Sequence, residues 1–268
     1  MKEEISKYHA VGTDLRKAQL RMLEILTAVD RVCRKHNIPY WLDYGTLLGA
    51  VRHGGFIPWD DDVDISMMKE DYERFLAIAP HELPEQFVVQ NLTTEKYYPN
   101  TFTKIVDKNS RIIDGTGAYS QSRRKYRGLW IDIFPIVKGN VHLRLWLDPL
   151  YRRCFRRVHH CEPFGVAVMI AYMLFPFAWT AMQLMRFLIL FCNKNLRMDE
   201  FGIVGGEEVR FQKYYDDFIP TKEILFEDRL FPVPNHFEKL LTQYYGDYMQ
   251  LPPEEERVWH NNGMTIFP

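Results

Sequence analysis

Four aspartates lie close together in a stretch that is otherwise apolar or turn-forming. Asp60, Asp61, Asp62 and Asp64 belong to the run GGFIPWDDDVDIS, residues 54–66. Successive side chains of a β-strand point to opposite faces, so a strand here would place Asp60, Asp62 and Asp64 on one face and Asp61 on the other. Carboxylates two residues apart then repel each other by about 2 kcal/mol at roughly 7 Å and an effective dielectric constant of about 20. A bound cation is the simplest compensation.

The spacing of this acidic run excludes two familiar sites and leaves others open. An EF-hand loop that began at Asp60 would need Gly and Glu where Ile65 and Asp71 stand. An aspartyl-phosphate phosphatase places its nucleophile after a hydrophobic strand, which Pro58 would break. A sugar-nucleotide glycosyltransferase also holds a metal with a short acidic motif, so that class stays open. A solvated acidic loop or a helix cap stays open too.

The run DYGTLLGAVRHGGF, just upstream, is typical of a phosphate-binding turn. Gly45 and Thr46 follow an expected short strand and begin an expected helix. Backbone N–H groups at a helix N-terminus favour an anion, and glycine permits close approach. A Gly-Thr-helix element followed by Asp-x-Asp therefore predicts a site that grips a phosphate and holds the metal that bridges its oxygens.

A long motif resembles the signature of the LicD family, the phosphocholine transferases of bacterial surface polysaccharides. The motif is YWLDYGTLLGAVRHGGFIPWDDDVDI, and the resemblance continues through TKIVDKNSRI, GLWIDIFPI and FPVPNHFEKLLTQYYGDYMQLPPEEER. It covers most of the chain outside roughly residues 141–194. Fukutin and fukutin-related protein, which transfer ribitol phosphate, are distant members of the same group.

The resemblance implies a fold and a metal site. The fold is α+β, a nucleotidyltransferase-like mixed β-sheet flanked by helices, with a helical and partly very apolar insertion. Asp62 and Asp64 correspond to paired ligands for Mg²⁺ or Mn²⁺, and Asp132 in WIDIF is the third carboxylate and the candidate base on the acceptor hydroxyl. Asp60 would ligate a second ion or hold a water. Asp61 would support the metal ligands from behind or act as a cap. A solvent-facing strand aspartate is the alternative for Asp132.

Donor binding is expected from residues around these carboxylates. Gly45 and Thr46 should cradle the donor phosphates, and the nearest candidate cations for the pyrophosphate are Arg52, His53, Lys104 and Arg111. Each of these cations has an alternative role as a surface charge, and His53 as a cap of the short helix.

Aromatic residues near the motif suggest a site for a quaternary ammonium group. Tyr44, Trp59 and Trp130 are candidates, because such cations bind aromatic faces. Core packing is the alternative for each.

The activity that the resemblance implies is transfer of a substituted phosphate, in the first instance phosphocholine from CDP-choline, with release of CMP. The acceptor would be a sugar hydroxyl of a surface polysaccharide, lipopolysaccharide or teichoic acid precursor, either free or lipid-linked. Transfer of ribitol or glycerol phosphate and glycosyl transfer are alternatives. A catalytically silent nucleotide- or saccharide-binding scaffold is the alternative of another class.

Hydrophobic periodicity predicts where the elements lie. Leu15, Met22, Leu26, Val29 and Cys33 recur at helical spacing, which predicts a helix over residues 13–36 with Thr13 as its N-cap. Strands alternate with helices up to residue 140, and the pattern is helical afterwards. We expect a catalytic core over 1–140, an apolar helical insertion over 141–194 and a C-terminal region over 195–268 that completes the catalytic unit.

Residues 163–185 carry no formal charge and are long enough to span a bilayer, although Pro176 interrupts them. Arg152, Arg153, Arg156 and Arg157 precede them. Two buried helices, or a peripheral membrane anchor over 163–192 with the arginines on anionic head groups, are the main alternatives. A true span is disfavoured, because it would separate the C-terminal region from the aspartates.

Composition favours a cytoplasmic enzyme. A net charge of −1 gives no general attraction for nucleic acid. The N-terminal sequence MKEEISKYHA has no apolar core typical of a signal peptide. The four cysteines are spaced for neither a zinc site nor a disulfide framework. We expect a cytoplasmic location, peripheral on the inner face of the membrane if residues 163–192 bind lipid.

Overall fold

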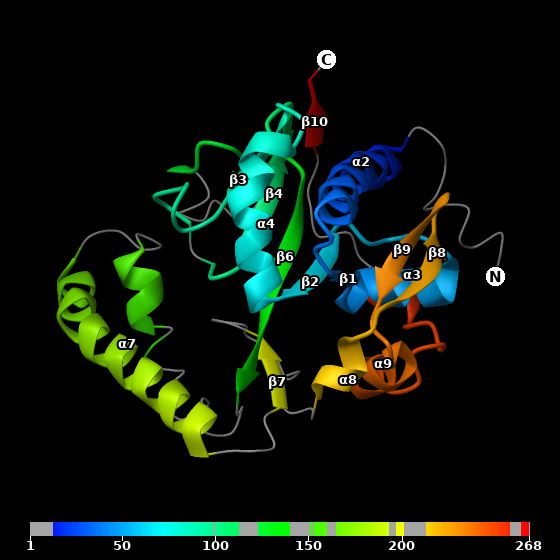
Figure 1. Ribbon diagram of the computed structural model, residues 1–268. Coiled ribbons are helices and arrows are strands. Elements are labelled where there is room, and N and C mark those ends of the chain that lie inside the picture. Colours follow the sequence, from blue (N-terminus) through cyan, green and yellow to red (C-terminus); the bar gives the residue numbers. More distant parts are fainter. Residues whose placement is uncertain are drawn as a thin grey trace.

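The computed structural model describes residues 13–98, 100–112, 123–139, 151, 153–159, 165–192, 197–200, 213–257 and 264–267. They form a mixed β-sheet flanked by helices, together with one long apolar helix that extends from the body of the molecule (Figure 1). The predicted α+β class is therefore confirmed.

The main sheet has six strands in the order β1-β2-β6-β4-β3, with β7 paired to the far end of β6. The pair β2·β6 is parallel and all other pairs are antiparallel. The strands are β1 (Trp41–Leu42), β2 (Asp64–Met68), β3 (Phe87–Gln90), β4 (Thr103–Asp107), β6 (Trp130–Gly139) and β7 (Arg197–Glu200).

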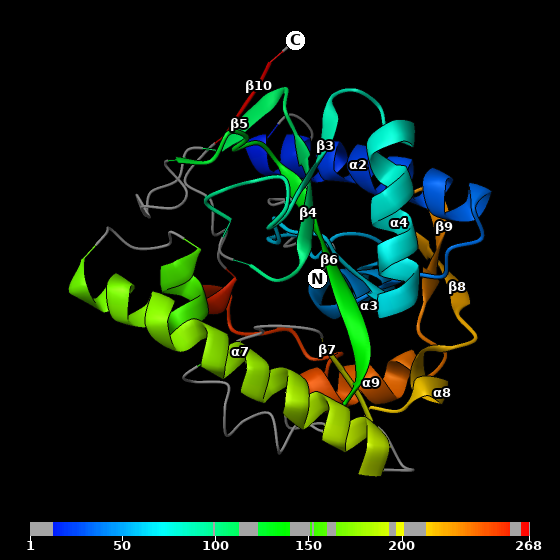
Figure 2. The same ribbon diagram turned by 60° about the vertical axis from the view of Figure 1, so that its left-hand side comes forward.

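The other elements surround this sheet. The helices are α2 (Asp14–Lys35), α3 (Tyr44–His53), α4 (Lys69–Glu82), α7 (Val166–Cys192), α8 (Tyr215–Phe218) and α9 (Phe237–Tyr245). The described chain also contains a hairpin of β8 (Lys222–Phe226) and β9 (Arg229–Val233), a separate pair of β5 (Ser110–Ile112) with β10 (Met264–Ile266), the short 3-10 helix η2 (Glu254–Glu256) and a helical segment at 153–158. Figure 2 shows β5 and β10 at the end of the molecule opposite α8 and α9.

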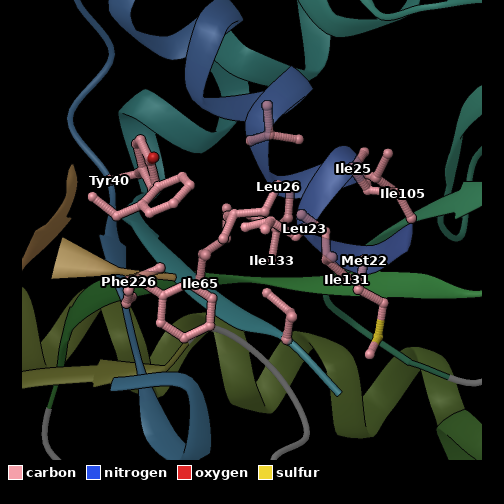
Figure 3. Close-up of a cluster of buried hydrophobic side chains, with 14 of the residues drawn as sticks. Met22, Leu23, Ile25, Leu26, Tyr40, Ile65, Ile105, Ile131, Ile133 and Phe226 are labelled. Atoms are coloured by element: carbon pink, nitrogen blue, oxygen red, sulfur yellow. The ribbon is translucent and has the colours of Figure 1, made fainter. Parts of the chain in front are cut away.

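Helix α2 covers one face of the sheet. Thr13 caps it, as predicted, by accepting a hydrogen bond from the backbone N–H of Arg16 at 3.3 Å. The predicted apolar stripe is buried, and Figure 3 shows Met22 and Leu26 of this stripe against Ile65, Ile131 and Ile133 of β2 and β6. Because strand side chains alternate, Asp64 and Asp132, the neighbours of these isoleucines, point to the opposite face.

Two expectations about local structure are wrong. Strand β2 begins at Asp64, so residues 60–63 are irregular and strand alternation does not place Asp60, Asp61 and Asp62. The apolar segment forms one helix, α7, which continues through Pro176, and most of its large side chains are exposed. It is not a pair of buried helices.

The C-terminal region contributes to the same core as the N-terminal part. Phe226, Phe231, Val233 and Leu241 are buried in the cluster that contains Leu26 and Ile65. The division into segments at residues 140 and 194 stays a prediction.

Candidate active site

Two of the predicted carboxylates lie on adjacent parallel strands. Asp64 is the first residue of β2, and its partner in the register of β2 and β6 is Asp132. The backbone N–H of Asp132 donates to the carbonyl oxygen of Val63 at 2.8 Å. Pairing therefore brings together two carboxylates that are 68 residues apart in sequence, on the face of the sheet opposite α2.

Asp60 and Asp62 approach the same place from the loop that precedes β2. A Cβ atom built on Gly45 would lie 2.9 Å from Oδ2 of Asp60 and 4.0 Å from Oδ1 of Asp62. Glycine at the start of α3 thus leaves the space that the Asp60 carboxylate fills. The prediction that Asp60, Asp62 and Asp64 gather holds, but a loop packed on α3 gathers them in place of strand alternation.

Burial raises the pKa values of all four carboxyl groups. For Asp60 and Asp64 the pKa lies well above the usual range. Burial is the largest cause, and repulsion from the charge of Asp62 is the second. The pKa of Asp62 is raised by burial and then by Asp132. Asp60 and Asp62 are thus close enough for each to affect the pKa of the other. The carboxyl groups of the cluster disfavour having all their members charged at once.

Asp61 is part of this electrostatic group. It is buried, its backbone N–H donates to Oδ1 of Asp60 at 3.1 Å, and its charge contributes to the raised pKa values of Asp60 and Asp62. Strand alternation, from which the direction of Asp61 was expected, does not apply, because β2 has not yet begun at this position. The supporting or capping role of Asp61 stays a prediction.

Lys104 is the cation closest to the carboxylates. Its Nζ lies 2.7 and 3.0 Å from the two carboxylate oxygens of Asp132, and 3.9 Å from the ring centroid of Trp130. Burial lowers the pKa of Lys104, and Asp132 opposes that shift. The same ion pair opposes the rise in the pKa of Asp132, which burial causes. Lys104, predicted as a pyrophosphate ligand, is thus placed at the site but engaged with Asp132.

The start of α3 is built around Asp43, which the sequence analysis did not single out. Asp43 is buried, accepts from the backbone N–H of Tyr44 at 2.9 Å as the N-cap, and accepts from Oγ of Ser66 at 2.7 Å. Burial raises its pKa, against the charge of Lys213. An aspartate directly before an expected helix was the available signal.

Thr46 has a structural contact that the phosphate-cradle prediction did not include. Its buried Oγ1 accepts from the backbone N–H of Asp64 at 2.8 Å. The hydroxyl therefore fixes the first residue of β2 against the N-terminus of α3. That contact positions Asp64.

The remaining predicted cations are distributed differently. Arg52 donates from Nε to Nε2 of His53 at 2.9 Å and from a terminal nitrogen to the carbonyl oxygen of Tyr248 at 3.0 Å. Burial lowers the pKa of Arg52, and the charge of Asp60 opposes the shift, so Arg52 borders the cluster. Arg111 is exposed on β5, which pairs with β10 outside the main sheet; in the described part of the chain no ion pair joins it to the aspartates.

Each aromatic residue considered for an ammonium site already faces a cation of the chain. Nζ of Lys213 lies 5.7 Å from the ring centroid of Tyr44, and Cζ of Arg257 lies 5.2 Å from that of Trp59. Trp130 faces Lys104, as described above. All three rings are thus suited to cations, in separate contacts.

The chemistry of the carboxylates fits a hard divalent cation, since oxygen donors are what Mg²⁺ prefers and the carboxyl groups disfavour one another's charged forms. Within the described ranges, however, no three His, Cys, Asp or Glu side chains stand in a ready-made ligand arrangement. The ion pair with Lys104 accounts for this at Asp132.

Comparison with known proteins gives the family. A family description, LicD/FKTN/FKRP, nucleotidyltransferase domain, matches residues 37–164, which include all the aspartates of the site. Lipopolysaccharide cholinephosphotransferase LicD of Haemophilus influenzae is 33% identical over 262 residues, covering 92% of this chain and 96% of that protein. Human ribitol 5-phosphate transferase FKRP is 59% identical over 115 residues, covering 42% of this chain but only 23% of FKRP. The chain belongs to the LicD family, and these relatives are transferases.

Proposed function

We propose that the chain is a metal-dependent phosphotransferase that moves phosphocholine from CDP-choline to a sugar hydroxyl of a surface polysaccharide or lipopolysaccharide precursor, with release of CMP. The observation that carries the proposal is the gathering of Asp60, Asp62, Asp64 and Asp132 in one half-buried group at the N-terminus of α3. Buried like charges are costly unless a ligand compensates them, so their presence favours a function over a structural role.

Specific residues take roles in this proposal. Asp62, Asp64 and Asp132 would hold Mg²⁺ or Mn²⁺, with Asp60 in reach of a second ion or a bound water. When bound, the ion would neutralise the negative charge on the donor pyrophosphate. Gly45 lets the Asp60 carboxylate approach the N-terminus of α3, whose backbone N–H groups would bind the donor phosphates, and Lys104 and Arg52 place positive charge next to Asp132 and Asp60.

The transfer itself is an in-line displacement. The acceptor hydroxyl oxygen forms a bond to the phosphorus that bears choline, the bond from that phosphorus to the oxygen of CMP breaks, and CMP leaves with the electron pair. The hydroxyl proton passes to the carboxylate of Asp132, whose raised pKa suits a base. Positioning and charge stabilisation provide the rate, as in other phosphoryl transfers.

The relatives support the donor class and leave two candidates for the group. The full-length match to a lipopolysaccharide cholinephosphotransferase favours phosphocholine and a lipopolysaccharide-type acceptor. The 59% identity to FKRP, a ribitol 5-phosphate transferase, favours ribitol phosphate, but over a much shorter region. We prefer phosphocholine because the first match extends over 92% of the chain.

Calorimetric titration of the purified chain with CDP-choline, CDP-ribitol and CDP-glycerol, each with and without Mg²⁺, tests the proposal. We expect CDP-choline to bind best and only with Mg²⁺, and CMP to be released when lipopolysaccharide precursor is added. Asp62→Asn and Asp64→Asn should each lower the rate of CMP release at least about 100-fold. Asp247→Asn, at an exposed position, serves as the control.

Three results would count against the proposal. If every CDP-alcohol bound equally well with and without Mg²⁺, the metal site would be contradicted. CMP release near the wild-type rate in both site variants would contradict the ligand assignment. A preference for CDP-ribitol would replace phosphocholine by ribitol phosphate.

A further inference from the structure

Helix α7 presents an unusually apolar surface to solvent. It has 27 residues, a length of about 40 Å. Phe177 and Met173 expose 75% and 71% of their surface, although a soluble protein normally buries such side chains. The other large exposed apolar residues of α7 are Val166, Met169, Ile170, Tyr172, Leu174, Trp179, Leu184, Phe187 and Leu188.

The opposite face of α7 is packed, so this exposed surface has a fixed orientation. Val168, Ala171, Ala178 and Met182 are buried at helical spacing. Residues 153–158 are helical and lie against α7: the ring centroids of Phe155 and Phe175 are 6.2 Å apart, and the hydroxyl of Tyr172 donates to the carbonyl oxygen of Val158 at 3.0 Å. These contacts fix the rotation of α7 about its own axis. Turning the helix therefore cannot bury its exposed apolar surface against the other described elements without exposing the face that is now packed.

In the sequence, the charges within and directly beside α7 are mostly positive. Residues 149–198 contain seven lysines and arginines and one acidic residue, although the whole chain has a net charge of −1. Arg153 and Arg156 are exposed on the helical segment that packs against α7. Positive charge beside an exposed apolar helix complements an anionic lipid surface, where acyl chains take the apolar side chains and phosphates take the arginines.

The strand pairing around α7 restricts how it can meet a membrane. Gly139 at the end of β6 pairs with Arg197 at the start of β7, so the chain leaves and re-enters the sheet at the same point. Only four residues, 193–196, separate α7 from β7, so the Cα atoms of Cys192 and Arg197 are at most about 18 Å apart and the C-terminal end of α7 stays near the sheet. In the described part of the chain α7 is the one helix long and apolar enough to cross a bilayer, over Val166–Met185. A single crossing would put the two ends of the excursion on opposite sides, whereas the β6·β7 pair needs both on one side.

We propose that α7 lies in the plane of a membrane interface, with Met173, Phe177 and Phe187 in the acyl region and Arg153 and Arg156 on anionic head groups. The occupant of the apolar surface is a lipid bilayer. This inference stands apart from the phosphotransferase proposal, since it rests on α7 and its flanking strands and not on the aspartates. Figures 1 and 2 show α7 at the edge of the molecule, where a flat surface could meet it.

Co-sedimentation of the full chain with lipid vesicles tests this proposal. We expect binding to vesicles of phosphatidylglycerol and phosphatidylcholine, and much weaker binding to phosphatidylcholine alone or at high salt. The double variant Met173→Glu, Phe177→Glu should bind at least about tenfold more weakly. The control is Leu225→Glu, Leu230→Glu on the β8–β9 hairpin, where both leucines are 52% exposed; this variant should bind like the wild type.

Two more measurements separate insertion from other kinds of contact. Trp179 lies on α7, so brominated lipids should quench the protein's fluorescence, and Trp179→Phe should remove most of the quenching. Arg153→Glu, Arg156→Glu should remove the preference for anionic vesicles, while circular dichroism confirms that each variant is folded.

The proposal is overturned if the wild-type chain stays in solution with anionic vesicles at low salt, or if the hairpin control loses binding as much as the α7 variant does. It is also overturned if α7 covers a second copy of the chain. In that case the wild type would be a dimer without lipid, and the Met173, Phe177 variant would be a monomer with unchanged vesicle binding.

Discussion

Asp60 lies beside Asp62 in the cluster, and this has a consequence for stability. The pKa of Asp60 is higher in the folded chain than in the unfolded chain, because burial and then Asp62 disfavour its charged form. The stabilising contribution of proton binding is present in full below the unfolded pKa and is lost as pH rises through the folded pKa. At pH 8 without metal the cluster therefore lowers the free energy of unfolding.

We predict that Asp60→Asn stabilises the metal-free chain. In EDTA at pH 8, urea denaturation should give a free energy of unfolding higher than that of the wild type by on the order of 2 kcal/mol, the size of one buried like-charge interaction. The difference should shrink as the pH falls and vanish below the unfolded pKa of Asp60, where the carboxyl group is protonated in both states. Asp247→Asn is the exposed control and should change little. A less stable Asp60→Asn variant at pH 8 would contradict the electrostatic account.

The sequence predicted which residues meet at the site better than it predicted how they meet. The acidic run and Asp132 were identified from residue type and resemblance, and the structure brings them together. The ion pair of Lys104 with Asp132 was not predicted, because it depends on β4 lying beside β6, and strand order is not encoded in local periodicity. The same holds for the contact of Lys213 with Tyr44.

The helix α3 positions the acidic loop by packing directly on its backbone. A Cβ atom on Gly49 would lie 2.5 Å from the carbonyl oxygen of Gly55 and 3.0 Å from the backbone nitrogen of Ile57. The loop that leads to Asp60 thus runs against α3 at a distance that only glycine allows. Gly54, at the C-cap, has a positive φ of 71° and open space around its Cα.

We predict that two alanine substitutions, one within α3 and one at its C-cap, destabilise the chain for different reasons. Gly49→Ala should lower the free energy of unfolding by about 1–3 kcal/mol, because the backbone clash outweighs the helix propensity that alanine adds, which is about 1 kcal/mol. It should also weaken CDP-choline binding, since the loop carries Asp60. Gly54→Ala should cost about 1 kcal/mol through backbone strain alone and leave binding nearly unchanged. Urea denaturation and calorimetry check both, and equal effects on binding would contradict the positioning role of Gly49.

Helices and strands were predictable from sequence to different degrees. The stripe of α2 has a clear 3.6-residue period and a capping threonine, so both its extent and its buried face were predicted correctly. The segment that forms α7 is apolar on all sides, and such a pattern does not distinguish a buried helix from an exposed one. Its exposure became clear only when the neighbouring elements were in place.

At the scale of the whole molecule, the β8–β9 hairpin contacts helix α2 and the loop after α3, which come from the N-terminal part of the chain. Arg16 of α2 donates to both carboxylate oxygens of Glu227, at 3.0 and 2.7 Å. The backbone N–H of Glu227 donates to the carbonyl oxygen of Gly54 at 2.8 Å. Together with the burial of Phe226 and Phe231, these contacts support the proposal that residues after 195 complete the catalytic unit.

The pairing of Gly139 with Arg197 predicts that residues 140–196 can be removed without loss of the core. Joining the two residues through Asn-Gly gives β6 and β7 a two-residue hairpin turn of the favoured kind. We expect this variant to unfold cooperatively and to bind CDP-choline with Mg²⁺ as the wild type does, because the aspartates, α3 and the hairpin all lie outside the excised segment. Binding to anionic vesicles should be lost, because α7 is absent. Urea denaturation, calorimetry and co-sedimentation measure these three properties on one preparation. Loss of cooperative unfolding would show that the apolar segment is part of the core and not an insertion.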